Sequence, residues 1–180
     1  KFEMCSFLTQ IVYGCVLLVV LGLSLSALFV DNWVKADGTQ TGFLCDSTVP
    51  SVSTKFCPGW WEKLETYKRV VVVCLIIAII IEVACLVWNL FTICACCCKE
   101  YLIHPLSGLS LLSVIALAIS VIVFAVNSET IRKQAATASG TSMDTTSLGT
   151  SFILECLALG LALINTVIAA VAVFFAEKCI

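Results

Sequence analysis

Residues 31–69 read DNWVKADGTQTGFLCDSTVPSVSTKFCPGWWEKLETYKR and form a polar segment between two long apolar runs. The segment holds Cys45 and Cys57, which are separated by eleven residues and have no histidine or acidic cluster beside them. A metal site would need such ligands, so a disulfide is the favoured interpretation. Closing a loop of this size contributes roughly 3 kcal/mol to stability. The alternative is a pair of free thiols, which oxidise readily when they are exposed.

The residues around the two cysteines predict a β-hairpin. β-branched and aromatic residues are frequent in 41–45 and 52–57, which lie on either side of Pro50. Amphipathic indole rings favour the membrane interface, and the segment's tryptophans lie at the edges of apolar runs. These tryptophans are Trp33, Trp60 and Trp61.

The composition excludes a soluble globular protein. Hydrophobic residues make up 61% of the 180 residues and charged residues 12%, and the mean hydropathy is +1.09. Four apolar runs reach the length of roughly 20 residues that a membrane-spanning helix needs. We therefore predict a single all-α membrane domain, with the lipid bilayer as a partner. The predicted spans are 7–30, 70–91, 106–126 and 152–175, and the outer loops are 31–69 and 127–151. The net charge of -2 gives no reason to expect nucleic acid.

Four spans place both termini on one side of the membrane, and two rules disagree about which side this is. The positive-inside rule favours the face with more basic residues, which is the face opposite the termini. Cysteine chemistry favours the reverse, because Cys45 and Cys57 need an oxidising compartment. We give more weight to the cysteines and predict cytoplasmic termini. The basic residues are Lys1, Lys99 and Lys178 on the terminal side, and Lys35, Lys55, Lys63, Lys68, Arg69, Arg132 and Lys133 on the other.

Polar and small residues recur at spacings of three and four within the spans, which predicts inward-facing seams. In the second span these residues are Cys74, Ala78, Glu82, Cys85 and Asn89, and in the fourth they are Glu155, Ala158, Ala162, Asn165, Ala169, Ala172 and Ala176. The strict alternation in the fourth span suits left-handed bundle packing. Pro105 is expected in the first turn of the third span, where a missing N–H costs nothing.

Two of these polar residues are expected to meet. Counting from the predicted outer ends of their helices places Glu82 and Asn165 at the same depth. A charged carboxyl at mid-membrane is costly, so we expect Glu82 to be protonated and to donate to Asn165 or a serine. For Glu82 we favour a hydrogen-bonded contact between helices over a role in a proton or ion pathway. Glu155, near the outer end, is expected to be solvated.

A group of juxtamembrane thiols lies on the terminal side. Such cysteines are candidates for S-palmitoylation, which would attach this side to the leaflet. The alternative is a zinc site with His104 as a further ligand, but the run C-A-C-C-C lacks the paired C-x-x-C spacing of structural zinc. The candidate palmitoylation sites are Cys94, Cys96, Cys97, Cys98, Cys5 and Cys179.

These residues resemble the claudin superfamily signature of W, G-L-W, C and C, with four spans and a basic residue entering the second span. Phe43 or Leu44 stands in place of the signature's second tryptophan, and the usual two-residue gap before the first cysteine is missing. The spacing from Trp33 to Arg69 and the run 89–93 (NLFTI) most resemble the peripheral myelin protein and epithelial membrane protein branch. The matching residues are Trp33, Gly42, Leu44, Cys45, Cys57 and Arg69.

The resemblance implies a left-handed bundle of four transmembrane helices with a small extracellular β-sheet that contains the Cys45–Cys57 bridge. It also implies a non-enzymatic protein of the plasma membrane without a cofactor, and the chain has no phosphate loop or nucleophile–base constellation. We expect a function at cell–cell junctions or in membrane organisation, exerted through the first outer loop. The partner would be another membrane protein, either of the same family in cis or trans or a channel subunit. The alternative function is that of an auxiliary subunit of an ion channel or receptor.

Overall fold

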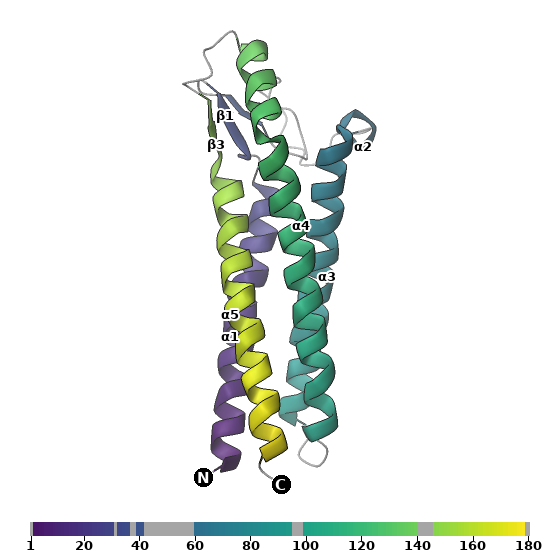
Figure 1. Ribbon diagram of the computed structural model, residues 1–180, viewed down its shortest axis with the longest axis vertical. Coiled ribbons are helices and arrows are strands. Elements are labelled where there is room, and N and C mark those ends of the chain that lie inside the picture. The colour runs from purple at the N-terminus through teal and green to yellow at the C-terminus, as the bar shows by residue number, and fades with distance from the viewer. Residues whose placement is uncertain are drawn as a thin grey trace.

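The computed structural model describes residues 2–30, 32–36, 39–41, 60–94, 99–139 and 146–178. Four long helices lie side by side, and both termini lie at one end of them, here called the terminal end (Figure 1). Three short strands and a short helix lie at the opposite end, here called the sheet end (Figure 1). In chain order the elements are α1 (Phe2–Phe29), β1 (Val34–Ala36), β2 (Thr39–Thr41), α2 (Trp60–Lys63), α3 (Thr66–Cys94), α4 (Lys99–Ser139), β3 (Thr146–Leu148) and α5 (Thr150–Lys178).

The long helices are apolar enough and long enough to cross a membrane. The stretches that meet both conditions are Phe7–Phe29, Thr66–Ile93, Pro105–Thr130 and Thr150–Val171. Large apolar side chains point outward from all four helices, among them Leu18, Ile80, Ile122 and Val167. Lipid is the solvent that such a surface requires.

The helices form a ring in which α1 and α4 each pack against both α3 and α5. The predicted seams face inward: Ala78, Cys85, Asn89, Ala158 and Ala169 are all buried. Small residues allow close approach of helices in lipid, where no hydrophobic force draws them together. The inward faces of the second and fourth spans were therefore predicted correctly over the described side chains.

The helices begin before the predicted spans. Helix α3 begins at Thr66, within residues 62–69, which the sequence predicts as a charged helical lead-in to the span at residue 70, and α4 begins at Lys99 rather than at residue 106. Pro105 therefore lies inside α4 and not in its first turn, where its ring removes one backbone hydrogen bond. Helix α4 is 41 residues long and continues to Ser139, well beyond the predicted end of the third span.

The described sheet joins the two outer segments of the chain. Strand β1 lies in the centre and pairs antiparallel with β2 and β3, so that Val34 is opposite both Thr41 and Leu148. This sheet uses different residues from the hairpin that the sequence suggested. The strands predicted at 41–45 and 52–57 lie outside the described residues, except for Thr41 at the end of β2.

A cluster of hydrogen bonds fixes the start of α5 to the end of α1. The backbone N–H of Gly149 donates to the Trp33 carbonyl at 2.7 Å, and that of Ser151 donates to the Asn32 carbonyl at 3.0 Å. The Ser151 hydroxyl donates to the Val30 carbonyl at 2.7 Å, and the Asn32 side-chain amide donates to the Thr150 hydroxyl at 3.2 Å. These bonds satisfy backbone groups that the helix ends leave without partners.

Gly149 lies too close to Asn32 to carry a side chain. A Cβ atom at Gly149 would lie 1.8 Å from the Asn32 carbonyl oxygen and 2.7 Å from the Trp33 carbonyl carbon, both of which are backbone atoms. We expect Gly149→Ala to destabilise the protein by about 1–3 kcal/mol, the usual cost of overpacking. The measurement is thermal unfolding of the purified protein in detergent micelles.

The matched control is Gly160→Ala, within α5, where nothing lies within 4 Å of the added Cβ. Alanine is the better helix former by about 1 kcal/mol, so this variant should be unchanged or more stable. Equal unfolding temperatures for the two variants would contradict the close approach at Gly149.

Candidate functional site

The indole of Trp33 closes the bundle at the sheet end. Trp33 is 2% exposed, and its ring centroid lies 4.8 Å from that of Phe124 and 6.5 Å from that of Phe152. Its Nε1–H donates to the Ala27 carbonyl at 2.9 Å. Because Ala27 lies in the last turn of α1, this bond caps the C-terminal end of that helix. The Trp33 indole, Phe124 and Phe152 are called the aromatic plug below.

The sequence prediction for the tryptophans was wrong for Trp33. Its ring is buried between α1, α4 and α5 instead of lying at the lipid interface. Trp61 is 40% exposed, as an interfacial tryptophan should be. The sequence alone does not distinguish a tryptophan at the lipid interface from one buried at the end of a span. Both environments offer an apolar contact for the ring and a hydrogen-bond partner for the N–H.

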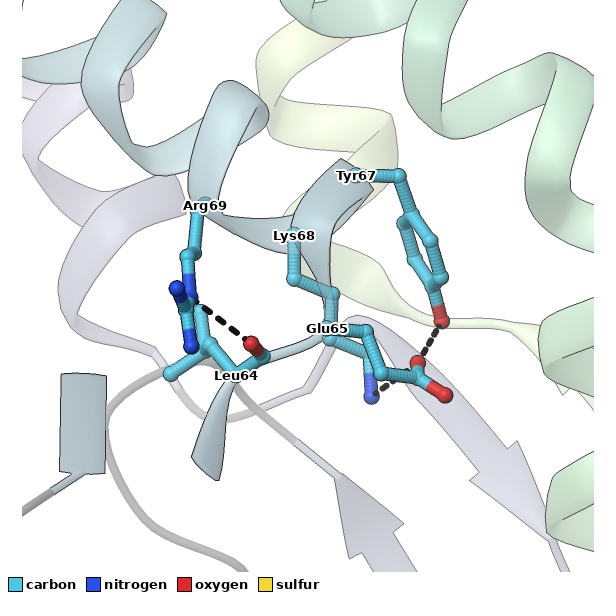
Figure 2. A network of polar contacts seen from close by, with 5 residues as sticks. All are labelled: Leu64, Glu65, Tyr67, Lys68 and Arg69. Atoms are coloured by element: carbon cyan, nitrogen blue, oxygen red, sulfur yellow. Dashed lines mark hydrogen bonds and ion pairs between the residues drawn. The ribbon is translucent and has the colours of Figure 1, made fainter. Parts of the chain in front are cut away.

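Arg69 holds the turn between α2 and α3. Its Nε donates to the Leu64 carbonyl at 2.8 Å and its Nη2 donates to the Glu62 carbonyl at 2.9 Å. The first of these bonds is drawn in Figure 2, where the Arg69 side chain points back toward Leu64. The guanidinium also lies 5.8 Å from the Trp61 ring centroid, within the range of a cation–π contact. The predicted helical lead-in at 62–69 is therefore two helices with a turn between them.

A second polar group covers the other side of the turn. Glu65 accepts a hydrogen bond from the Tyr67 hydroxyl, and its carboxylate lies 3.4 Å from the Lys68 ammonium. Figure 2 shows Tyr67 and Lys68 on the same side as Glu65 and away from Arg69. An exposed ion pair of this kind contributes little to stability. The carbonyl contacts of Arg69 therefore dominate the geometry of the turn.

The centre of the bundle contains two buried carboxyl groups. Glu82 on α3 is 0% exposed, and its Oε1 accepts hydrogen bonds from Ser24 at 3.3 Å and from Ser113 at 3.2 Å. Glu155 on α5 is also 0% exposed. The expectation that Glu155 is solvated was therefore wrong. Phe152 of the aromatic plug precedes Glu155 by one turn and lies toward the sheet end.

The hydrogen bonds of Glu82 go to serines. Asn165 is buried at 2% exposure, but its Oδ1 has no hydrogen-bond partner, so the described side chains do not join Glu82 to Asn165. The depth estimate assumed that the helix ends are level. In the structure Ser113 of α4 reaches Glu82, whereas Ser110, one turn nearer the terminal end, reaches Thr166, the residue after Asn165. Glu82 therefore lies about one turn nearer the sheet end than Asn165.

Neutral polar groups continue toward the terminal end. The Asn89 side-chain amide donates to the Gln10 carbonyl at 3.2 Å, and the hydroxyls of Ser110 and Thr166 lie 2.8 Å apart. The Gln10 amide and the Tyr13 hydroxyl are buried without a hydrogen-bond partner. Serines and amides in the spans, at the spacing of the inward seams, are the sequence signal for this polar interior. The sequence analysis placed Asn89 on an inward seam as well, but it expected a contact between helices only for Glu82, with Asn165 or a serine.

Most of the predicted loop sites lie outside the described residues. Trp33 and Arg69 have described side chains, and the helices place Cys5 and Cys94 at the terminal end. The sites without a described position are Gly42, Leu44, Cys45, Cys57, Cys96, Cys97, Cys98 and Cys179. The side chains of Cys5, Cys94 and His104 are also not described.

Four apolar helices of spanning length, with lipid-facing side chains, define a multi-pass membrane protein. A family model described as "Tight junction protein, Claudin-like" matches residues 4–180. The chain belongs to this claudin-like family, which confirms the resemblance found in the sequence. No curated protein and no solved structure matches the chain.

The contacts of Arg69 require a forked side chain. We expect Arg69→Lys to destabilise the sheet end by about 2 kcal/mol, because hydrogen bonds to charged groups contribute about that much and lysine cannot reach both carbonyls. Thermal unfolding and the rate of limited proteolysis near 60–65 measure this loss. The control is Lys68→Gln, which removes the partly exposed ion pair with Glu65 and the cation–π contact with the Tyr67 ring. It should change stability by less than about 1 kcal/mol. A larger loss for Lys68→Gln than for Arg69→Lys would contradict this account of the turn.

Proposed function

We propose that the protein is a non-enzymatic component of cell–cell junctions or of membrane organisation, and that it binds another membrane protein through its first outer loop. The observation that supports this most is the claudin-like family match over residues 4–180. The partner would be a second claudin-like protein, in the same membrane or on the opposing cell.

The sheet end is suited to present such a loop. Strand β1 is held from both sides by β2 and β3, and the residues just before it are held by the backbone bonds of Gly149 and Ser151. Arg69 fixes the turn where residues 60–64 enter α3. Both ends of the outer segment 31–69 therefore start from ordered positions, which lowers the conformational entropy that a binding surface loses on association.

We further propose that the sheet end is extracellular and that Cys45 and Cys57 form a disulfide there. The support is chemical: a disulfide persists in an oxidising compartment, and a bridge across the loop would restrict the segment between the two held ends. The termini are then cytoplasmic, and the protein lies in the plasma membrane.

The test is localisation in cells that form contacts. We expect the tagged wild-type protein to concentrate where two expressing cells meet, and Cys45→Ser with Cys57→Ser to lose this enrichment several-fold. Cys156→Ser is the control, because Cys156 is an exposed cysteine on the lipid-facing side of α5 and should not affect the outer loop. Labelling of thiols before and after reduction shows whether the bridge has formed.

Two results would contradict the proposal. One is free thiols at both positions in the protein at the cell surface. The other is a diffuse distribution together with stoichiometric copurification with an ion channel or receptor, which would instead establish the auxiliary-subunit function.

We also propose that the juxtamembrane cysteines at the terminal end are palmitoylated. Helices α1 and α3 bring Cys5 and Cys94 to this end, and clustered cysteines beside a span are typical acceptors. Hydroxylamine-dependent acyl exchange should give a mass shift that becomes smaller when the cluster Cys94, Cys96, Cys97 and Cys98 is replaced by serine, and that is lost when Cys5 and Cys179 are replaced as well. Cys15→Ser, inside the span of α1, is the control and should keep the shift. An unchanged shift in the cluster variant would exclude these sites.

A further inference from the structure

Two carboxyl groups are buried in the half of the bundle nearer the sheet end. Glu82 on α3 and Glu155 on α5 are both 0% exposed. Ser24 in the last turns of α1 donates to Glu82, and Glu155 lies one turn after Phe152 of the aromatic plug. Both α3 and α5 pack against α1 and α4. The pair therefore lies in the interior that all four helices enclose.

The hydrogen bonds of this pair are incomplete. Ser24 and Ser113 both donate to the Oε1 of Glu82. The Oε2 of Glu82, both carboxyl oxygens of Glu155 and the hydroxyl of Ser120 are buried without any hydrogen-bond partner. An ionised carboxylate in such a position costs several kcal/mol, far more than the neutral acid. Two such charges near each other cost more still.

No basic side chain is available to balance these charges. The sequence contains no lysine, arginine or histidine in 7–30, 70–98, 105–131 or 150–177. The other titratable groups that act with the pair in the described residues are two thiols, Cys85 beside Glu82 and Cys156 beside Glu155. From α1 the hydroxyl of Ser24 faces the pair, and from α4 the hydroxyl of Ser113 does so.

A metal ion is a poorer candidate than a proton for neutralising the pair. Among the described residues no group of three or more histidine, cysteine, aspartate or glutamate side chains could hold a metal ion. A proton binds to a carboxyl oxygen without needing further ligands and converts an acceptor-only group into a donor.

We propose that Glu82 and Glu155 form a proton-binding site in the core of the bundle, in which each carboxyl group holds one proton at neutral pH. Each proton comes from bulk water and binds to one carboxylate oxygen, so the folded protein takes up two protons and the pair becomes neutral. This proposal is independent of the junction function.

The site is linked to the sheet end through α5. Ser151 and Phe152 lie one turn before Glu155. Ser151 donates hydrogen bonds to the Val30 and Asn32 carbonyls. Phe152 packs against the Trp33 ring. Loss of the protons would place negative charge directly beneath the aromatic plug. We therefore expect the packing of the sheet end to depend on the protonation of the pair.

Infrared spectroscopy of the protein in lipid nanodiscs tests the proposal directly. At pH 7.5 exposed carboxyl groups are ionised, so a carbonyl stretch of a protonated carboxylic acid should come only from the buried pair. We expect this band in the wild-type protein, a loss of about half its intensity in Glu82→Gln and in Glu155→Gln, and its absence in the double variant. Glu129→Gln is the control, because Glu129 is exposed on α4 and should leave the band unchanged.

Thermal unfolding across pH gives a second readout. The folded state retains protons that the unfolded chain releases at neutral pH, so the wild-type unfolding temperature should fall as the pH rises from about 6 to about 9. A fall of about 3 °C or more is expected. The double variant Glu82→Gln with Glu155→Gln, which mimics the neutral pair, should show a smaller slope, and Glu129→Gln should follow the wild type.

Two results would overturn the proposal. The first is the absence of a protonated-acid band in the wild-type protein at pH 7.5, a result that does not require any variant to fold. The second is stabilisation of the wild-type protein by sodium or calcium ions that the double variant lacks, because a cation would then occupy the site in place of the protons.

Discussion

The hydrogen bond from the Gly149 N–H to the Trp33 carbonyl is the constraint on which the sheet end depends. Trp33 follows α1 and Gly149 precedes α5, so this bond joins the first outer segment to the second. In lipid no hydrophobic force sets the register between helices, and polar contacts and close packing set it instead. With the bonds of Ser151 and Asn32 beside it, the Gly149 bond fixes where β1 stands relative to α5. The aromatic plug then fills the space beneath.

The sequence was sufficient to predict the four spans and their inward faces. Long apolar runs have one physical solution in lipid, the helix, because every backbone group must find a partner within the chain. Small and polar residues at spacings of three and four identified the buried side of α3 and α5, as Ala78 and Ala158 illustrate. The sequence analysis also singled out Trp33 and Arg69. Their hydrogen bonds go to carbonyl groups of the backbone, which leave no trace in the pattern of side chains.

The details that the sequence could not supply depend on how the elements are placed relative to one another. Glu82 and Asn165 were matched by counting from helix ends, but the contacts of Ser113 with Glu82 and of Ser110 with Thr166 place Glu82 about one turn nearer the sheet end. Glu155 was expected in water because it is near the start of its helix, and the aromatic plug buries it. Gly149 is required only because the Asn32 carbonyl lies where its Cβ would be, a contact between residues far apart in sequence.

The way in which Arg69 holds the turn has an evolutionary consequence. Arg69 donates to the backbone carbonyls of Glu62 and Leu64. Every amino acid has such a carbonyl. Substitutions at these two positions therefore leave both acceptors in place, so the side chains here can vary while the turn keeps its geometry. A single arginine thus makes the approach to α3 tolerant of substitution, and the bundle below does not have to change with it.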